Sequence, residues 1–183
     1  MVLIDGAEFP INHDFRACLR VIIAFEDPEL TGFEKQIIML ENLYPDKPDN
    51  LQAAFEQGLK FLNCGKAGSE EEPGPRLYSF EKDADLIFAA FRQLHGIDLS
   101  VIKLHWWEFT SLFMAILMTD SYYGNLVGLR KRLSDGTATK EEVQASKGMS
   151  DLLVIENDQV PLTPEERDME REFMRLVELG QKG

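Results

Sequence analysis

Cysteine and histidine are scarce in this 183-residue chain, which has two of the first and three of the second. Cys18 and Cys64 stand far apart, and no CxxC or HExxH pattern occurs. Disulfide-stapled folds and structural zinc sites need more of these residues at short, regular spacings. We therefore exclude both classes and predict that the two cysteines are buried free thiols.

Positive charge and long apolar runs are also in short supply. The chain has 19 basic and 32 acidic residues, a net charge of −13 and a pI of about 4.6. Such a field repels nucleic acids and anionic lipids. The most apolar run, residues 112–118, is too short to cross a bilayer, and no basic segment precedes an apolar one at the start. We expect a cytoplasmic protein that binds neither nucleic acid nor membrane.

Catalytic motifs are missing as well. The sequence contains no GxSxG, GxxxxGK[ST] or GxGxxG segment. The histidines are isolated, and His105 is more typical of a core or rim position than of acid–base chemistry. Glu81, Asp83 and Asp85 suit the first turn of a helix, whose dipole favours carboxylates, with a divalent-cation site as the alternative. We predict no enzyme activity, no catalytic residue, no metal site and no cofactor.

Apolar residues, which make up 44% of the chain, recur mostly at helical spacing. The exception is the start, where short apolar runs flank Asp5-Gly6 and predict a β-hairpin, with Pro10 limiting the second strand to an edge or end. The expected helices run from a cap at Asn12 or Asp14 to Asp27, from Thr31 to Pro45, from Asp49 to Gly65, from Ser79 to Gly96, over 99–118 behind Asp98, over 121–134, from Thr139, and over 163–179.

These elements predict a mainly α fold, a compact bundle of about six or seven helices with a short N-terminal β-hairpin. Residues 1–135 are expected to form the helical core domain. Within it, residues 65–77 hold three Gly, two Pro and three consecutive Glu, which indicates an exposed loop. Residues 136–183 are expected to be an acidic C-terminal appendage with a terminal helix, and residues 148–162 look irregular.

The helix expected at 99–118 is the strongest candidate for the centre of the core. Its apolar residues alternate at steps of three and four, and other apolar residues cover its remaining faces. Trp106 and Trp107 point about 100° apart on a helix. Either one of them meets a partner, or two core layers sandwich the helix. The partner-binding residues predicted from this region and from the basic cluster at 130–132 are Trp106, Trp107, Phe109, Phe113, Met114, Met118, Arg130 and Arg132.

Several segments together resemble a known family. They include Ile4-Asp5-Gly6, the run from Tyr78 to Asp85 (YSFEKDAD) and the run from Leu104 to Trp107 (LHWW). In this order they are similar to the gene-product-fifteen family of long-tailed bacteriophages and of prophages in Gram-positive hosts. The resemblance covers roughly residues 2–133. Residues 136–183 depart from it, because they are longer and more acidic than the usual family ending.

The resemblance implies a tail assembly chaperone. Such a protein coats the tape measure protein in the host bacterial cytoplasm, helps to recruit tail tube subunits, and is absent from the mature virion. The family carries no agreed catalytic residue. The alternative is a structural tail or connector protein that stays in the virion; a small enzyme and a regulator that binds host proteins are less favoured. The apolar helix also makes self-association an expected interaction.

Overall fold

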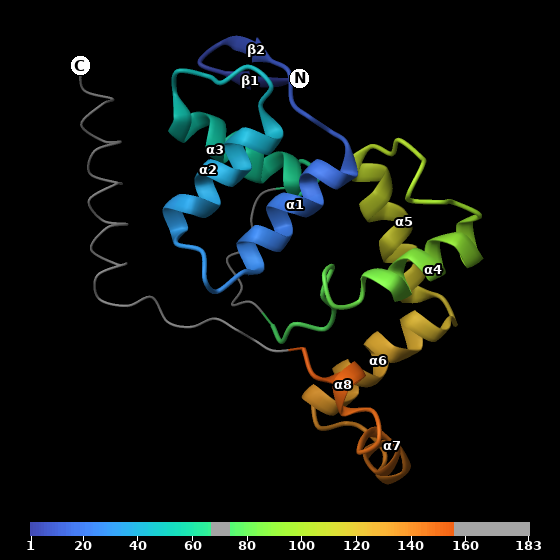
Figure 1. Cartoon of the computed structure of the whole chain (residues 1–183). Helices are drawn as coiled ribbons and strands as arrows, with labels where there is room; N and C mark the ends of the chain where they lie inside the picture. Colours follow the sequence, from blue (N-terminus) through green and yellow to red (C-terminus); the bar gives the residue numbers. More distant parts are fainter. Residues whose placement is uncertain (67–73, 156–183) are drawn as a thin grey trace. The chain divides into compact units, whose positions relative to one another are not determined.

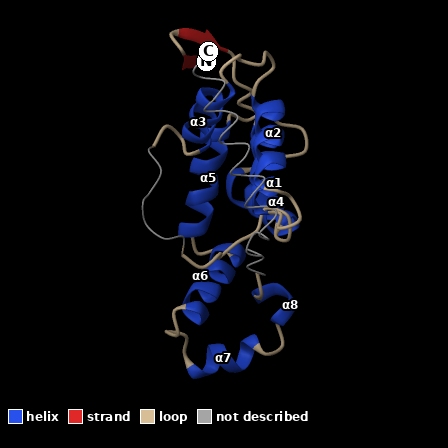
Figure 2. Ribbon diagram, turned by 90° about the vertical axis from the view of Figure 1, so that its left-hand side faces the viewer, coloured by secondary structure: helices blue, strands red, loops and turns tan. Residues whose placement is uncertain are grey.

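The computed structural model describes residues 1–66 and 74–155. These residues form eight helices, seven of them with at least seven residues, and one two-stranded hairpin at the N-terminus (Figures 1 and 2). The predicted mainly helical fold with an N-terminal hairpin is therefore confirmed. None of the helices in these two ranges is long and apolar enough to cross a membrane. The helix predicted over 163–179 lies outside the described residues.

The described residues divide into two compact units, residues 1–66 and residues 74–155. The first unit begins with the predicted hairpin, in which β1 (Val2–Ile4) pairs antiparallel with β2 (Ala7–Phe9). Asp5 and Gly6 have φ values of 50° and 82°, the left-handed conformation that a tight two-residue hairpin turn requires. The buried side chain of Ile4 connects the hairpin to the core of this unit, and β1 packs against α3 (Leu51–Leu62).

Three helices complete the first unit: α1 (Phe15–Glu26), α2 (Gly32–Leu43) and α3. Each has a side-chain N-cap, and Thr31 and Glu34 form the predicted capping box. The cap of α3 is Asn50, which corrects the prediction of Asp49. Helix α1 packs on α2, and α2 on α3. The core contains Ile11, Phe15, Cys18, Val21, Met39, Leu43, Tyr44, Ala54, Phe61 and Leu62.

Helix α2 presents a different face to this core from the one that its spacing suggests. Phe33 and Ile37, which appear to share an apolar stripe with Leu40, are 44% and 37% exposed. Met39, Leu40 and Leu43 are buried in their place. The long Met39 side chain reaches the inner position because α3 approaches closely at Gly58, where an added Cβ would lie 2.8 Å from the Met39 Cε.

The second unit contains α4 (Ala84–His95), α5 (Trp106–Met118), α6 (Tyr122–Ser134), α7 (Lys140–Ser146) and α8 (Ser150–Leu153). Two helix starts and one additional helix correct the sequence-based expectations. Residues 80–83 are a turn that precedes α4, residues 99–105 lie outside α5, and α8 falls within a segment expected to be irregular. Gly96, with φ of 67°, ends α4 as predicted.

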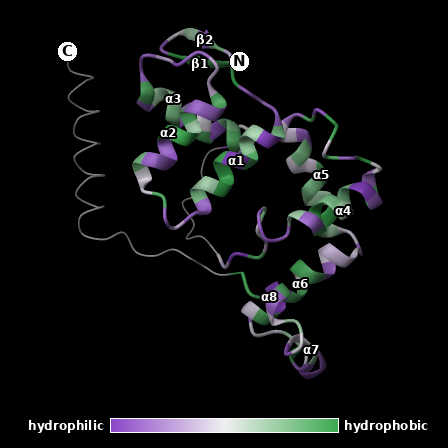
Figure 3. Ribbon diagram, viewed as in Figure 1, coloured by the Kyte–Doolittle hydropathy of each residue, from purple (hydrophilic) through white to green (hydrophobic). Residues whose placement is uncertain are grey.

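The core of the second unit is built from aromatic rings. The Phe91 and Phe109 rings stack with centroids 5.0 Å apart and planes 9° apart, and Phe109 also stacks with Trp106 and Phe113. Tyr78 and Phe113 form a T-shaped pair with centroids 5.1 Å apart. These rings come from α4, from α5 and from the segment before α4. Figure 3 colours most of α5 hydrophobic, in keeping with its central place in this unit.

Two glycines in α6 have opposite roles, although both lower the helix propensity of its sequence. A Cβ on Gly124 would lie 2.6 Å from the Thr119 carbonyl oxygen and 2.9 Å from that of Ile116, so this glycine lets α6 start close to the end of α5. A Cβ on Gly128 would meet only the flexible Arg132 guanidinium, at 3.3 Å.

We expect Gly124→Ala to lower the free energy of unfolding of the second unit by about 2 kcal/mol, because backbone atoms must move. Gly128→Ala is the matched control and is expected to raise it by up to about 1 kcal/mol. Denaturant unfolding followed by tryptophan fluorescence measures both values, since both tryptophans lie in α5. Equal effects of the two substitutions would contradict the close approach at Gly124.

Candidate partner-binding surface

Helix α5 has an inner and an outer face, both apolar. Trp106, Phe109, Phe113 and Ile116 are buried, and Trp106 is only 3% exposed. Trp107, Met114 and Met118 are 42%, 45% and 81% exposed. The two neighbouring tryptophans therefore diverge, the first into the core and the second outward.

Four exposed residues form a line, the outer stripe of α5, which we define as Trp107, Ser111, Met114 and Met118; Glu108 and Ala115 are exposed beside it. The four stand at positions i, i+4, i+7 and i+11, so they share one face of the helix over about 16 Å. The only polar member is Ser111, whose hydroxyl donates to the Trp107 carbonyl oxygen at 2.8 Å. With that hydroxyl bonded within the helix, the stripe offers a partner a mainly apolar contact.

His105 fixes the start of the stripe. It is the N-cap of α5, and its Nδ1 accepts a hydrogen bond from the Trp107 amide at 3.1 Å. The two rings also meet edge to face, with centroids 5.7 Å apart. The sequence favours a core or rim position for His105. Its capping role is not evident from the sequence, because histidine is not among the residues that usually cap helices.

The stripe lies on the less charged of the two units. Residues 74–155 have nine basic and ten acidic residues, whereas residues 1–66 have six basic and eleven acidic ones. Electrostatic repulsion of an acidic partner segment is therefore weaker at the second unit. Apolar contact can decide binding there.

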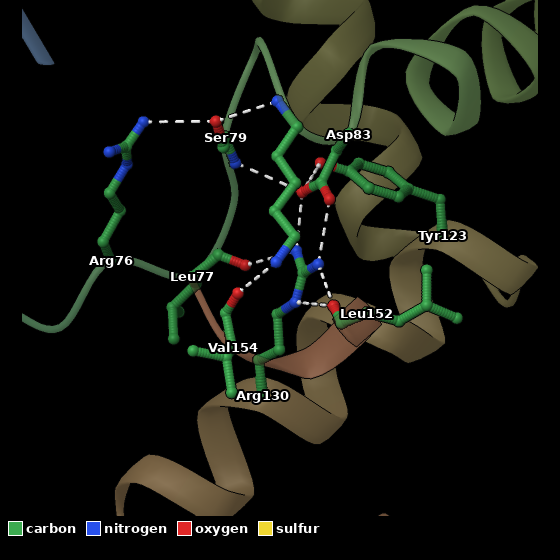
Figure 4. A network of polar contacts seen from close by, with 9 residues as sticks. Arg76, Leu77, Ser79, Asp83, Tyr123, Arg130, Leu152 and Val154 are labelled. Atoms are coloured by element: carbon green, nitrogen blue, oxygen red, sulfur yellow. Dashed lines mark hydrogen bonds and ion pairs between the residues drawn. The ribbon is translucent and has the colours of Figure 1, made fainter. Parts of the chain in front are cut away.

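A buried ion pair joins α6 to the turn before α4. The Arg130 guanidinium binds Asp83 through two bonds, Nη1 to Oδ2 at 2.6 Å and Nη2 to Oδ1 at 2.9 Å (Figure 4). Both side chains are at most 3% exposed. Asp83 Oδ2 also accepts from the Tyr123 hydroxyl and from the Ser79 amide, each at 3.1 Å. The pair thus fixes α4 and α6, the two helices that pack with α5 in this unit.

The surroundings of Asp83 set its charge. Burial raises the pKa of this carboxyl, but the hydrogen bonds and charge of Arg130 and the Ser79 amide outweigh it, so the pKa lies below its usual value. Burial, together with the negative charge of Asp83, raises the pKa of Tyr123. The network therefore holds a carboxylate, a guanidinium and a protonated phenol.

The structure separates the eight predicted partner-binding residues into two groups. Trp107, Met114, Met118 and Arg132 reach the surface of the second unit, and Arg132 forms an ion pair with Glu142. The buried group consists of Trp106, Phe109, Phe113 and Arg130. A partner can touch the first group without any unfolding, and the second group orients α5 beneath it.

The carboxylates considered for a divalent cation are also placed. Asp83 is engaged by Arg130, while Glu81 and Asp85 are exposed. Within residues 1–66 and 74–155, no three His, Cys, Asp or Glu side chains are grouped so as to hold a metal ion. Asp83 is thus a structural residue. Its position beside two other acidic residues in the sequence does not indicate this role.

The chain is similar to a known family of proteins. A family model described as Bacteriophage Gp15 protein matches residues 1–153, which include the first unit, all but the last two described residues of the second, and the outer stripe. The chain has no significant match among curated proteins or solved structures.

Proposed function

Because the chain belongs to the bacteriophage Gp15 protein family, we propose that it is a tail assembly chaperone. In this role it binds the tape measure protein and helps to recruit tail tube subunits. It works in the cytoplasm of the host bacterium and leaves before the virion is complete. Its partners are proteins, and neither nucleic acid nor membrane takes part.

The outer stripe of α5 is the observation that carries this proposal. A tape measure protein is a long, largely helical chain, and such a chain exposes apolar stripes until it is assembled. A surface of one tryptophan and two methionines suits such a client, since Trp gives a large apolar contact and Met adapts to differently shaped neighbours. The same stripe allows a second copy of the chain to bind when no client is present.

The charge distribution supports the same role. The net charge of −13 keeps a client coated with several copies dispersed in water. Most of that charge lies outside the second unit, so the surface that holds the client stays nearly neutral. Binding and solubility are therefore served by different parts of the chain.

Coexpression tests the proposal. With this chain present, we expect the soluble fraction of the tape measure protein to rise several-fold, and the two proteins to copurify. An unrelated acidic protein of similar size and charge serves as the control. If both proteins leave the tape measure protein equally insoluble, the chaperone role is wrong.

A structural tail or connector protein is the second candidate. The two roles differ in whether the chain stays in the particle. Mass spectrometry of purified virions separates them, since a chaperone is expected to be absent and a connector present in fixed copy number.

A further inference from the structure

The segment that contains α7 and α8, residues 140–155, adds almost nothing to the core of the second unit. Neither helix has a buried residue, and both Leu152 and Val154 are exposed. Beneath residues 153–155 runs an open groove with a volume of about 430 Å³, lined by Pro75, Leu77, Leu133, Leu153, Val154 and Ile155 among others. Apolar packing therefore contributes little to holding this segment in place.

Polar contacts hold it instead. Lys82 Nζ donates to the Val154 carbonyl oxygen at 2.6 Å, and Arg130 Nε donates to that of Leu152 at 3.1 Å. At the other end, Arg132 Nη2 lies 2.6 Å from Glu142 Oε1. Two of these three attachments use main-chain carbonyls two residues apart, so they depend on the path of the segment rather than on its side chains.

The half of this contact that belongs to the body of the unit has other supports. Besides the Leu152 carbonyl oxygen, Arg130 binds Asp83 and the Leu77 carbonyl oxygen (Figure 4). Just before the segment, Gly136 has φ of 69°, and the Thr137 and Ala138 amides both donate to the Arg132 carbonyl oxygen. The segment thus leaves α6 through one tight turn, and α4, α5 and α6 pack on one another without it.

We propose that residues 140–155 are an arm that opens and closes as a unit, latched by Lys82 and Arg130. Closed, it forms one wall of the groove. Open, it exposes the opposite wall, including Leu77 and Leu133, and so gives the protein an apolar surface that is absent from the closed form. This device is independent of the proposed chaperone role, because it depends only on contacts within the second unit.

Hydrogen exchange of the full chain, followed by mass spectrometry, tests the arm. Lys82 is exposed, so Lys82→Met removes one latch bond without disturbing the core. We expect exchange throughout 140–155 to accelerate about threefold to tenfold, with α4, α5 and α6 unchanged. Lys131→Met is the matched control: Lys131 pairs with Asp135 at the end of α6, so exchange in the arm should stay as in the unaltered chain.

Three results would overturn the arm. One is that, in the unaltered chain, residues 140–155 are as well protected from hydrogen exchange as α5 and α6. Another is Lys82→Met without any effect on exchange, which would mean that the segment frays without a latch. The last is acceleration at 150–155 alone, which would show that α7 and α8 do not move together.

Discussion

Arg130→Met is expected to lower the free energy of unfolding of the second unit by about 3–5 kcal/mol, because it leaves the buried Asp83 carboxylate without its cation. Met fills much of the same space, so the loss comes mainly from the missing charge and hydrogen bonds. Both oxygens of Asp83 lose their Arg130 donors, and so do the carbonyl oxygens of Leu77 and Leu152.

The two tryptophans make this effect measurable in one unit. Both lie in α5, so fluorescence during denaturant unfolding reports the second unit, while far-UV circular dichroism reports both units. Arg132→Met is the control: its ion pair with Glu142 is exposed, and we expect a loss of at most about 1 kcal/mol. A loss below 1 kcal/mol for Arg130→Met would show that the pair does not stabilise the unit.

The dependence of stability on acid pH tests the same ion pair independently. The pKa of Asp83 is lowered in the folded chain, so the stability it contributes is present above the unfolded value of about 3.9. That stability is lost as the pH falls from there through the folded pKa. The free energy of unfolding of the second unit, measured by fluorescence, should therefore fall below about pH 4 in the unaltered chain. Arg130→Met should remove this part of its dependence on pH.

Local sequence patterns predicted the elements well where neighbouring residues determine them. Asp5-Gly6 predicted the hairpin turn, Thr31 and Glu34 the capping box, and Gly96 the end of α4. The start of α5 was misplaced because the Val101 and Ile102 amides both bond to the Asp98 carbonyl oxygen. Leu99 and Ile102 in this isolated turn continue the three-and-four spacing of the apolar residues of α5 in the sequence, so periodicity alone cannot separate the two.

Local sequence patterns could not predict contacts between residues that are far apart in the sequence. Asp83 and Arg130 are 47 positions apart, and each had a sufficient local explanation, one as a helix-start carboxylate and the other as part of a basic cluster. Which of the two tryptophans faces the core also depends on the packing of α4 and α6 around α5. The sequence therefore identified α5 as the candidate surface but could not say which of its faces is free to bind.

Removing the two ends of the outer stripe should abolish most client binding. We expect Trp107→Ala combined with Met118→Ala to weaken binding of a helical tape measure segment by about 3 kcal/mol, roughly a hundredfold. The reason is that a tryptophan with 42% and a methionine with 81% of its surface exposed offer a partner much apolar area.

Biolayer interferometry with an immobilised tape measure segment measures the change. Leu51→Ala is the matched control, because Leu51 is as exposed as Met114, at 45%, but lies on the first unit. We expect it to bind as the unaltered chain does. The double variant must still unfold cooperatively in denaturant, which separates lost contact from lost structure. Equal binding by the double variant and the control, with both folded, would place the client elsewhere on the chain.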